Sequence, residues 1–124
     1  MPGKLILIVE DNPINLKLAQ VLLTKEGFSV KVATEAEEAL MMLNDFHPAL
    51  ILMDIQLPGM DGLQLTKILK LNPKTNDIII VALTAYAMKG DEEKVLKAGC
   101  DDYIAKPIDI HNLIKTVNKH LKKY

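Results

Sequence analysis

Residues 5–11 have the sequence Leu-Ile-Leu-Ile-Val-Glu-Asp, five apolar residues in an unbroken run followed directly by two acids. A short apolar run without polar alternation is typical of a strand buried on both faces in a parallel sheet. The acids that end the run would then lie at the carboxyl edge of that sheet. This stretch therefore predicts a parallel β-sheet with polar chemistry where its strands end.

The rest of the chain repeats the arrangement, because apolar runs alternate with amphipathic stretches about five times. Further strands are predicted at 29–33, 50–53, 78–83 and 103–105. Helices are predicted from residue 13 to about 26, 35 to about 46, 63 to about 71, 89 to 98, and 110 nearly to the end of the chain. Five strand–helix units with short connections imply an α/β fold in which helices cover both faces of a parallel sheet. Periodicity alone does not fix the order of the strands.

Local signals support the first two helices. Asn12 is a suitable cap for the first, with Pro13 at its first position, and Thr34 is a suitable cap for the second, with Glu37 in the capping-box position. The first helix is expected to bury the residues that recur at helical spacing, namely Ile14, Leu18, Val21 and Leu22.

Composition narrows the class of protein. The 124 residues fit one domain, residues 1–124, and the formal net charge of −1 argues against direct nucleic-acid binding. All 15 basic residues are lysine, which excludes a bidentate arginine clamp. A single cysteine, Cys100, excludes an internal disulfide. With neither a signal peptide nor an apolar run of about 20 residues, we expect a cytoplasmic protein without membrane insertion.

Polar residues follow four of the predicted strands. Glu10 and Asp11 follow the first strand, Asp54 the third, Thr84 the fourth and Lys106 the fifth. If the first and third strands are neighbours, three carboxylates converge on one small pocket, and like charges that close resist joint ionisation unless a cation joins them. Hard carboxylate oxygens suit Mg²⁺, with Mn²⁺ as an alternative. The simpler alternative for any one of these acids is a solvated loop residue.

The ordered set of Glu10-Asp11, residues 54–62, Thr84-Ala85 and Lys106-Pro107 resembles the response-regulator receiver domain of two-component signalling over essentially the whole chain. Within that family, residues 84–92 are most similar to small single-domain regulators of cell-cycle and phosphorelay circuits. The resemblance implies a flavodoxin-like (βα)5 doubly wound sheet with strand order 2-1-3-4-5.

The resemblance also implies a role for each site residue. Asp54 would accept a phosphoryl group from a phosphohistidine on a sensor histidine kinase or a histidine phosphotransfer protein. Asp11, Asp54 and the backbone carbonyl of Gln56 would bind Mg²⁺ directly, and Glu10 would act through water. Lys106 would pair with a phosphoryl oxygen. Such a chain is a phosphoacceptor with self-catalysed transfer, not an enzyme that turns over an external substrate.

The implied switch links Thr84, whose hydroxyl would bond the phosphoryl group, to Tyr103, which would turn inward in response. The face formed by the fourth helix, fifth strand and fifth helix would then meet a downstream protein. Gln56 and Tyr86 would tune hydrolysis, and a bulky Tyr86 predicts slow self-dephosphorylation. A cis bond is implied before Pro107.

Other functions stay open at this point. An aspartate-nucleophile phosphohydrolase shares the fold class, but its second acid would occupy the position of Gln56. A flavin carrier would need a phosphate cradle where Glu10 and Asp11 place negative charge. A receiver used only for docking, and one excised from a hybrid kinase or larger regulator, are further alternatives. Since the receiver would occupy all 124 residues, a full-length product is expected to signal through protein contacts.

Overall fold

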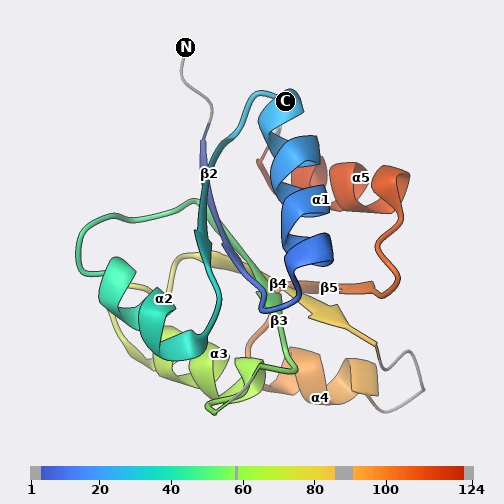
Figure 1. Ribbon diagram of the computed structural model, residues 1–124. Coiled ribbons are helices and arrows are strands. Elements are labelled where there is room, and N and C mark those ends of the chain that lie inside the picture. Colours follow the sequence, from blue (N-terminus) through green and yellow to red (C-terminus); the bar gives the residue numbers. More distant parts are fainter. Residues whose placement is uncertain (1–3, 58, 86–90, 122–124) are drawn as a thin grey trace.

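The computed structural model describes residues 4–57, 59–85 and 91–121, without the side chains of residues 91 and 92. Strands and helices alternate along the whole of this part of the chain (Figure 1). The elements are β1 (Leu5–Val9), α1 (Pro13–Lys25), β2 (Ser29–Ala33), α2 (Ala36–Met42), β3 (Leu50–Asp54), α3 (Gly62–Leu71), β4 (Ile79–Thr84), α4 (Asp91–Lys97), β5 (Asp102–Ala105) and α5 (Ile110–Leu121).

The five strands form one parallel sheet in the order β2-β1-β3-β4-β5, which confirms the expected order. In the register, Val9 lies opposite Met53, and Asp54 lies opposite Leu83. The carboxyl ends of β1, β3 and β4 therefore meet at one edge of the sheet, and the residues that follow these strands start close together.

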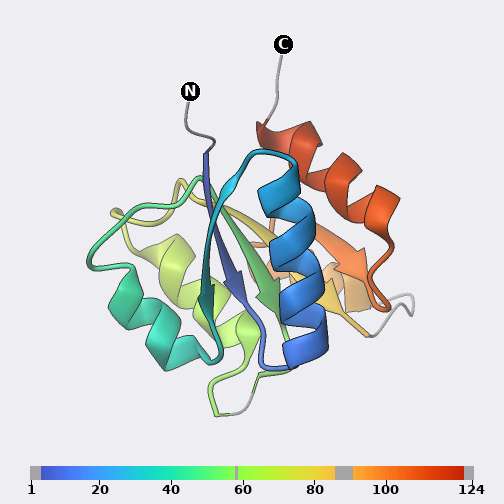
Figure 2. The same cartoon turned by 45° about the horizontal axis from the view of Figure 1, so that its top comes forward.

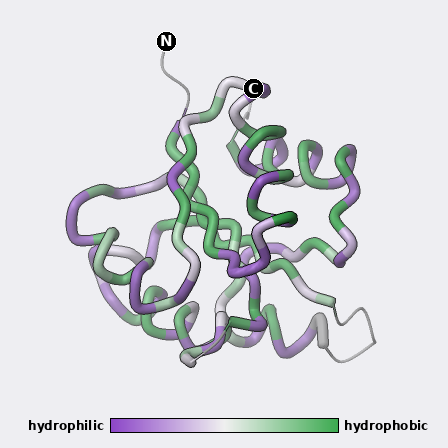
Figure 3. The backbone as a smooth tube through the Cα atoms, in the orientation of Figure 1, coloured by the Kyte–Doolittle hydropathy of each residue, from purple (hydrophilic) through white to green (hydrophobic). Residues whose placement is uncertain are grey.

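Helices cover both faces of the sheet, with α1 and α5 on one face and α2, α3 and α4 on the other (Figures 1 and 2). Alternate residues of β1 enter different cores. Ile6 and Ile8 pack on the α1/α5 side, whereas Leu7 and Val9 pack on the side of α2, α3 and α4. Burial on both faces explains the unbroken apolar sequence of β1, and the central strands are hydrophobic along their length (Figure 3).

Helix α1 begins as predicted, but it buries a different face. The Asn12 side chain accepts hydrogen bonds from the amides of residues 14 and 15, and Pro13 opens the helix. The prediction that Ile14 and Val21 face the core is wrong, since they are 77% and 49% exposed, while Ala19 and Leu23 are buried. The helix carries two apolar stripes, and the one containing the small Ala19 packs on the sheet. Pro13, Ile14, Lys17, Leu18 and Val21 line an open apolar groove on its outer side.

The second helix is shorter than predicted, and the predicted start of the fourth helix at residue 89 lies outside the described residues. Helix α2 ends at Met42, and its N-cap is Glu35, which makes no side-chain capping bond. The predicted cap, Thr34, instead donates its backbone amide to Oε1 of Glu38, at 2.7 Å. The extended N-cap backbone is therefore that of Glu35, one residue later than predicted. None of the helices in the described ranges is long and apolar enough to cross a membrane.

Candidate functional site

Three acids gather at the carboxyl edge of the sheet. One carboxylate oxygen from each of Glu10, Asp11 and Asp54 can be chosen so that all three lie within 4.8 Å of one another. Glu10 is fully buried, Asp54 is 2% exposed, and Asp11 is exposed. The structure therefore brings together the three carboxylates that the strand ends predicted, because β1 and β3 are neighbours.

Lys106 lies directly against two of these acids. Its Nζ is 2.9 Å from Oδ2 of Asp54 and 3.3 Å from Oε1 of Glu10. Its backbone amide donates to the carbonyl of Thr84 at 2.7 Å, and the following bond to Pro107 is cis, as expected. The last residues of β4 thus hold the backbone of Lys106, and its side chain reaches across to β3.

The electrostatics of Glu10 reflect its crowded position. Burial raises the pKa of its carboxyl to about 7, and the hydrogen bond with Asp54 adds to the rise. Asn12, predicted only as a helix cap, also donates its amide to Oε2 of Glu10 at 3.2 Å, which lowers this pKa in part. Burial opposes the charge on Lys106, but its hydrogen bond to Asp54 and the fields of both acids leave its pKa raised. The three carboxyl groups of the cluster therefore outnumber the one ammonium group that lies against them.

This donor set fits a hard divalent cation. Among the described residues, nothing donates a hydrogen bond to the buried Oε1 of Glu10, although Lys106 lies nearby. Three carboxylates of mixed burial, one of them open to solvent, match the oxygen ligands and retained water that Mg²⁺ prefers.

The loop after β3 holds the second oxygen of Asp54. The Gln56 amide donates to Oδ1 at 2.9 Å, while Lys106 contacts Oδ2, so both carboxylate oxygens have a fixed partner. Gln56 itself is exposed, and its backbone carbonyl belongs to the loop beside the acids.

The two residues of the expected switch lie on neighbouring strands. Thr84 is buried at the end of β4, where it pairs in register with Ala105. Tyr103 is half-buried on β5 and packs against the core shared with α2, α3 and α4. Tyr86 and Pro58 lie outside the described residues.

A family model of the response regulator receiver domain matches residues 6–118. The chain belongs to the response regulator receiver family. The expected similarity to small cell-cycle regulators is also confirmed. The polar-differentiation response regulator DivK of Brucella ovis is 44% identical over 118 residues, which cover 95% of this receiver and 96% of the relative.

Solved structures show the same fold. A response regulator from Chloroflexus aurantiacus superimposes with a TM-score of 0.92 at 30% identity, covering 98% of this receiver and 99% of that chain. The receiver domain of a Pseudomonas aeruginosa sensor histidine kinase, solved with a magnesium ion in its active-site cleft, gives 0.88 at 33%, with coverage of 98% and 99%. The receiver domain of Saccharomyces cerevisiae Ssk1, crystallised with the histidine phosphotransfer protein Ypd1, gives 0.90 at 35%, with coverage of 98% and 90%.

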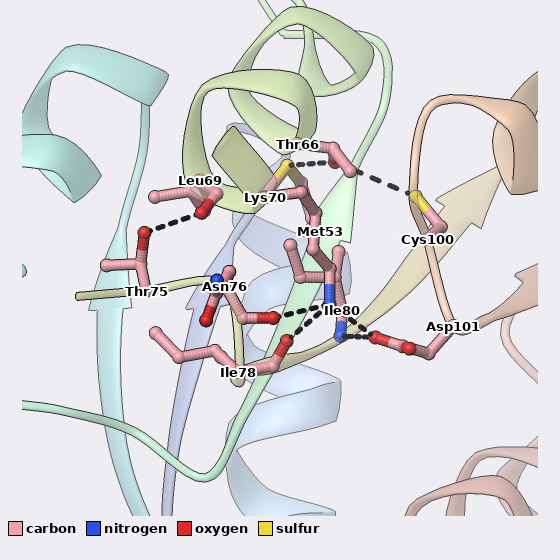
Figure 4. A network of polar contacts seen from close by, with 10 residues as sticks. All are labelled: Met53, Thr66, Leu69, Lys70, Thr75, Asn76, Ile78, Ile80, Cys100 and Asp101. Atoms are coloured by element: carbon pink, nitrogen blue, oxygen red, sulfur yellow. Dashed lines mark hydrogen bonds and ion pairs between the residues drawn. The ribbon is translucent and has the colours of Figure 1, made fainter. Parts of the chain in front are cut away.

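Away from the acid cluster, a network of polar contacts joins α3 to the sheet (Figure 4). Lys70 Nζ lies 3.0 Å from Oδ2 of Asp101 and donates to the carbonyl of Ile78 at 2.9 Å. The same Asp101 oxygen accepts from the Ile80 amide at 2.8 Å. Lys70 is thus a second partly buried lysine with an acid partner, at a place remote from the acid cluster.

Proposed function

We propose that Asp54 accepts a phosphoryl group from a phosphohistidine on a sensor histidine kinase or histidine phosphotransfer protein. The observation that carries this proposal is the placement of the Asp54 carboxylate. It is almost fully buried, with one oxygen on Lys106 and the other on the Gln56 amide, beside Glu10 and Asp11. A carboxylate held this way is oriented before its partner arrives, which lowers the entropic part of the barrier.

In the transfer, an Asp54 carboxylate oxygen forms a bond to phosphorus as the phosphorus–nitrogen bond of the donor breaks, and the electron pair leaves with the imidazole. Lys106 then offers its ammonium to a phosphoryl oxygen. Asp11, Asp54 and the Gln56 carbonyl would hold Mg²⁺ or Mn²⁺, with Glu10 acting through water. Such an ion would offset the charge on the transferring group.

The open apolar groove on the outer side of α1 is a suitable docking surface for the partner that carries the phosphohistidine. It begins at Pro13 and Ile14, two residues beyond the acid cluster, and continues along the helix through Leu18 and Val21. A donor whose histidine reaches Asp54 would come close to this end of the groove, because Pro13 follows Asp11 by two residues. Exposed apolar residues that continue directly from the site favour an apolar helical surface on the donor.

The switch and its output complete the proposal. Thr84 donates its hydroxyl to the phosphoryl group, and Tyr103 changes its packing on β5 in response. The surface of α4, β5 and α5 then meets a downstream protein in the cytoplasm. Tyr103 is half-buried and packs against the core to which α4 contributes, which supports a coupling between β5 and α4. Gln56 and Tyr86 set the hydrolysis rate.

Transfer from a labelled phosphohistidine donor tests this function. A histidine phosphotransfer protein carrying a radioactive phosphoryl group is mixed with the receiver and Mg²⁺. Label should leave the donor and appear on the parent chain, and Asp54→Asn should take none. Retention of all label on donors that bind the parent chain would reduce the receiver to a docking module. Release of free phosphate from simple phosphate esters would favour the phosphohydrolase alternative.

A further inference from the structure

Gly62, the first residue of α3, packs directly against the backbone that carries Asp54. A Cβ at this position would lie 2.5 Å from the carbonyl oxygen of Asp54 and 2.6 Å from the Cα of Ile55. Gly62 is not among the described glycines with positive φ, so its requirement for glycine comes from space rather than from backbone conformation. Both obstructing atoms are backbone, and no side chain can swing away to make room.

This close approach closes the loop that shapes the site. The Gly62 amide donates to the carbonyl of Ile55 at 3.1 Å, and the Ile55 amide donates to the carbonyl of Leu83 on β4, also at 3.1 Å. Gln56 is the next residue inside the closed loop, and its amide holds Oδ1 of Asp54. A displacement of Gly62 would therefore reach Gln56 through the hydrogen bond to the Ile55 carbonyl and the peptide bond that joins Ile55 to Gln56.

The helix on the other side of the contact cannot simply retreat. Thr66 Oγ1 donates to the Gly62 carbonyl at 2.8 Å. The same hydroxyl lies 3.7 Å from Sδ of Met53 and 3.6 Å from Sγ of Cys100, all in the buried core (Figure 4). Because Thr66 is fully buried against Met53 and Cys100, the first turn of α3 has no open space to move into, and a side chain at residue 62 would displace the end of β3 and the start of the loop.

We propose that Gly62 is a positioning residue for the phosphoacceptor site, acting through Ile55 and Gln56 on the Asp54 carboxylate and on the Gln56 carbonyl. This inference rests on the proposed function, because it assigns the Gln56 carbonyl and Asp54 to one metal-binding set. Gly62 touches neither phosphoryl group nor metal. Its contribution is the space that lets the loop close against β3.

The test compares Gly62→Ala with Gly27→Ala, using Mg²⁺ alone as the probe. Gly27 has φ +95° and open space around it, so alanine there strains the backbone without touching the site. Both variants should unfold at lower denaturant concentration than the parent. Mg²⁺ affinity, read from amide shifts in an NMR titration, should fall about tenfold or more in Gly62→Ala and stay at the parental value in Gly27→Ala. The Gln56 amide resonance should also move in metal-free Gly62→Ala.

Equal Mg²⁺ affinities in the parent and a folded Gly62→Ala would overturn the inference. If that variant does not fold, Thr66→Val decides, because it removes the bond to the Gly62 carbonyl and keeps the side-chain shape. It should weaken Mg²⁺ binding severalfold, and parental affinity would overturn the inference. Failure of the proposed function looks different, since the parent chain itself would then neither bind Mg²⁺ nor take a phosphoryl group.

Discussion

The ammonium of Lys106 lies 2.9 Å from a carboxylate oxygen of Asp54, at the end of a strand two places away in the sheet. The two residues are 52 positions apart in the sequence (106 − 54), and only the parallel order β3-β4-β5 brings them together. The same Nζ also reaches Glu10 from β1, so one lysine joins the carboxyl ends of three strands. This relationship makes Lys106 a stabilising partner of both acids, and under the proposed function the same ammonium would pair with a phosphoryl oxygen.

Replacing Lys106 by methionine should separate these two roles. Removing one member of a buried ion pair leaves uncompensated charge, so metal-free Lys106→Met should lose about 3 kcal/mol of unfolding free energy. Mg²⁺ should recover part of this loss, while phosphorylation by acetyl phosphate falls sharply. Lys70→Met is the control, because it breaks the partly exposed ion pair with Asp101, away from the acid cluster. It should lose stability and keep its phosphorylation rate. Equal phosphorylation by both variants would contradict the role of Lys106.

The pKa of Glu10 predicts an unusual pH dependence. Because its pKa is raised from 4.5 to about 7 in the folded chain, the folded state binds the proton more tightly between these values. The free energy of unfolding contributed by this group should therefore fall as pH rises through that window, by at most about 3 kcal/mol. Over the same window, Mg²⁺ affinity should rise as the carboxyl ionises.

Urea denaturation in a chelator at a series of pH values checks this, with Glu10→Gln as the comparison. Glutamine does not titrate, so the stability of the variant relative to the parent should increase with pH. Parallel profiles for the two proteins would show that folding does not raise the pKa of Glu10.

The outer groove of α1 predicts a selective defect in partner recognition. Ile14→Ser should slow phosphoryl transfer from a phosphohistidine protein about tenfold, since loss of a contact residue commonly costs ~1.4 kcal/mol. Phosphorylation by acetyl phosphate should not change. Met41→Ser on α2 is the control, because Met41 is 72% exposed, much like Ile14, and lies on the opposite face of the sheet. Equal slowing with both donors would place the defect in the site rather than in docking.

Tyr86 predicts a long-lived phosphoryl group. Its bulk, two residues after Thr84, is expected to impede the attacking water. Tyr86→Ala should therefore shorten the half-life of the phosphorylated chain severalfold, measured as loss of label after the donor is removed. An unchanged or longer half-life in the variant would refute the role of this residue.

The sequence predicted the strands and the acids at their ends because burial on both faces leaves a plain apolar run. It could not predict which strands are neighbours, since periodicity carries no such information, and the order 2-1-3-4-5 came from the family resemblance. For α1, the prediction is wrong at Ile14 and Val21 and correct at Leu22, which packs against the core. Ile14, Leu18 and Val21 form an apolar stripe as regular as the one that packs. Burial of small Ala19 decided between them.

Contacts between backbone segments that are distant in the sequence could not be predicted either. In the sequence, Gly62 follows a stretch rich in turn residues, where glycine has many uses, and only the fold shows its approach to the Asp54 carbonyl. The Asn12 amide on Glu10 left no signal beyond that of an ordinary helix cap. The sequence pattern can predict that a polar side chain lies at a strand end. It cannot predict the backbone contacts that orient this side chain.

The central claim is that Asp54 is the phosphoacceptor, and intact mass spectrometry with acetyl phosphate and Mg²⁺ tests it most directly. The parent chain should gain one adduct of about 80 Da that hydroxylamine removes, as expected of an acyl phosphate. Asp45→Asn, which changes an exposed acid on the surface, should gain the same adduct, and Asp54→Ala should gain none. Absence of the adduct from the parent chain, or its persistence in Asp54→Ala, would contradict the account.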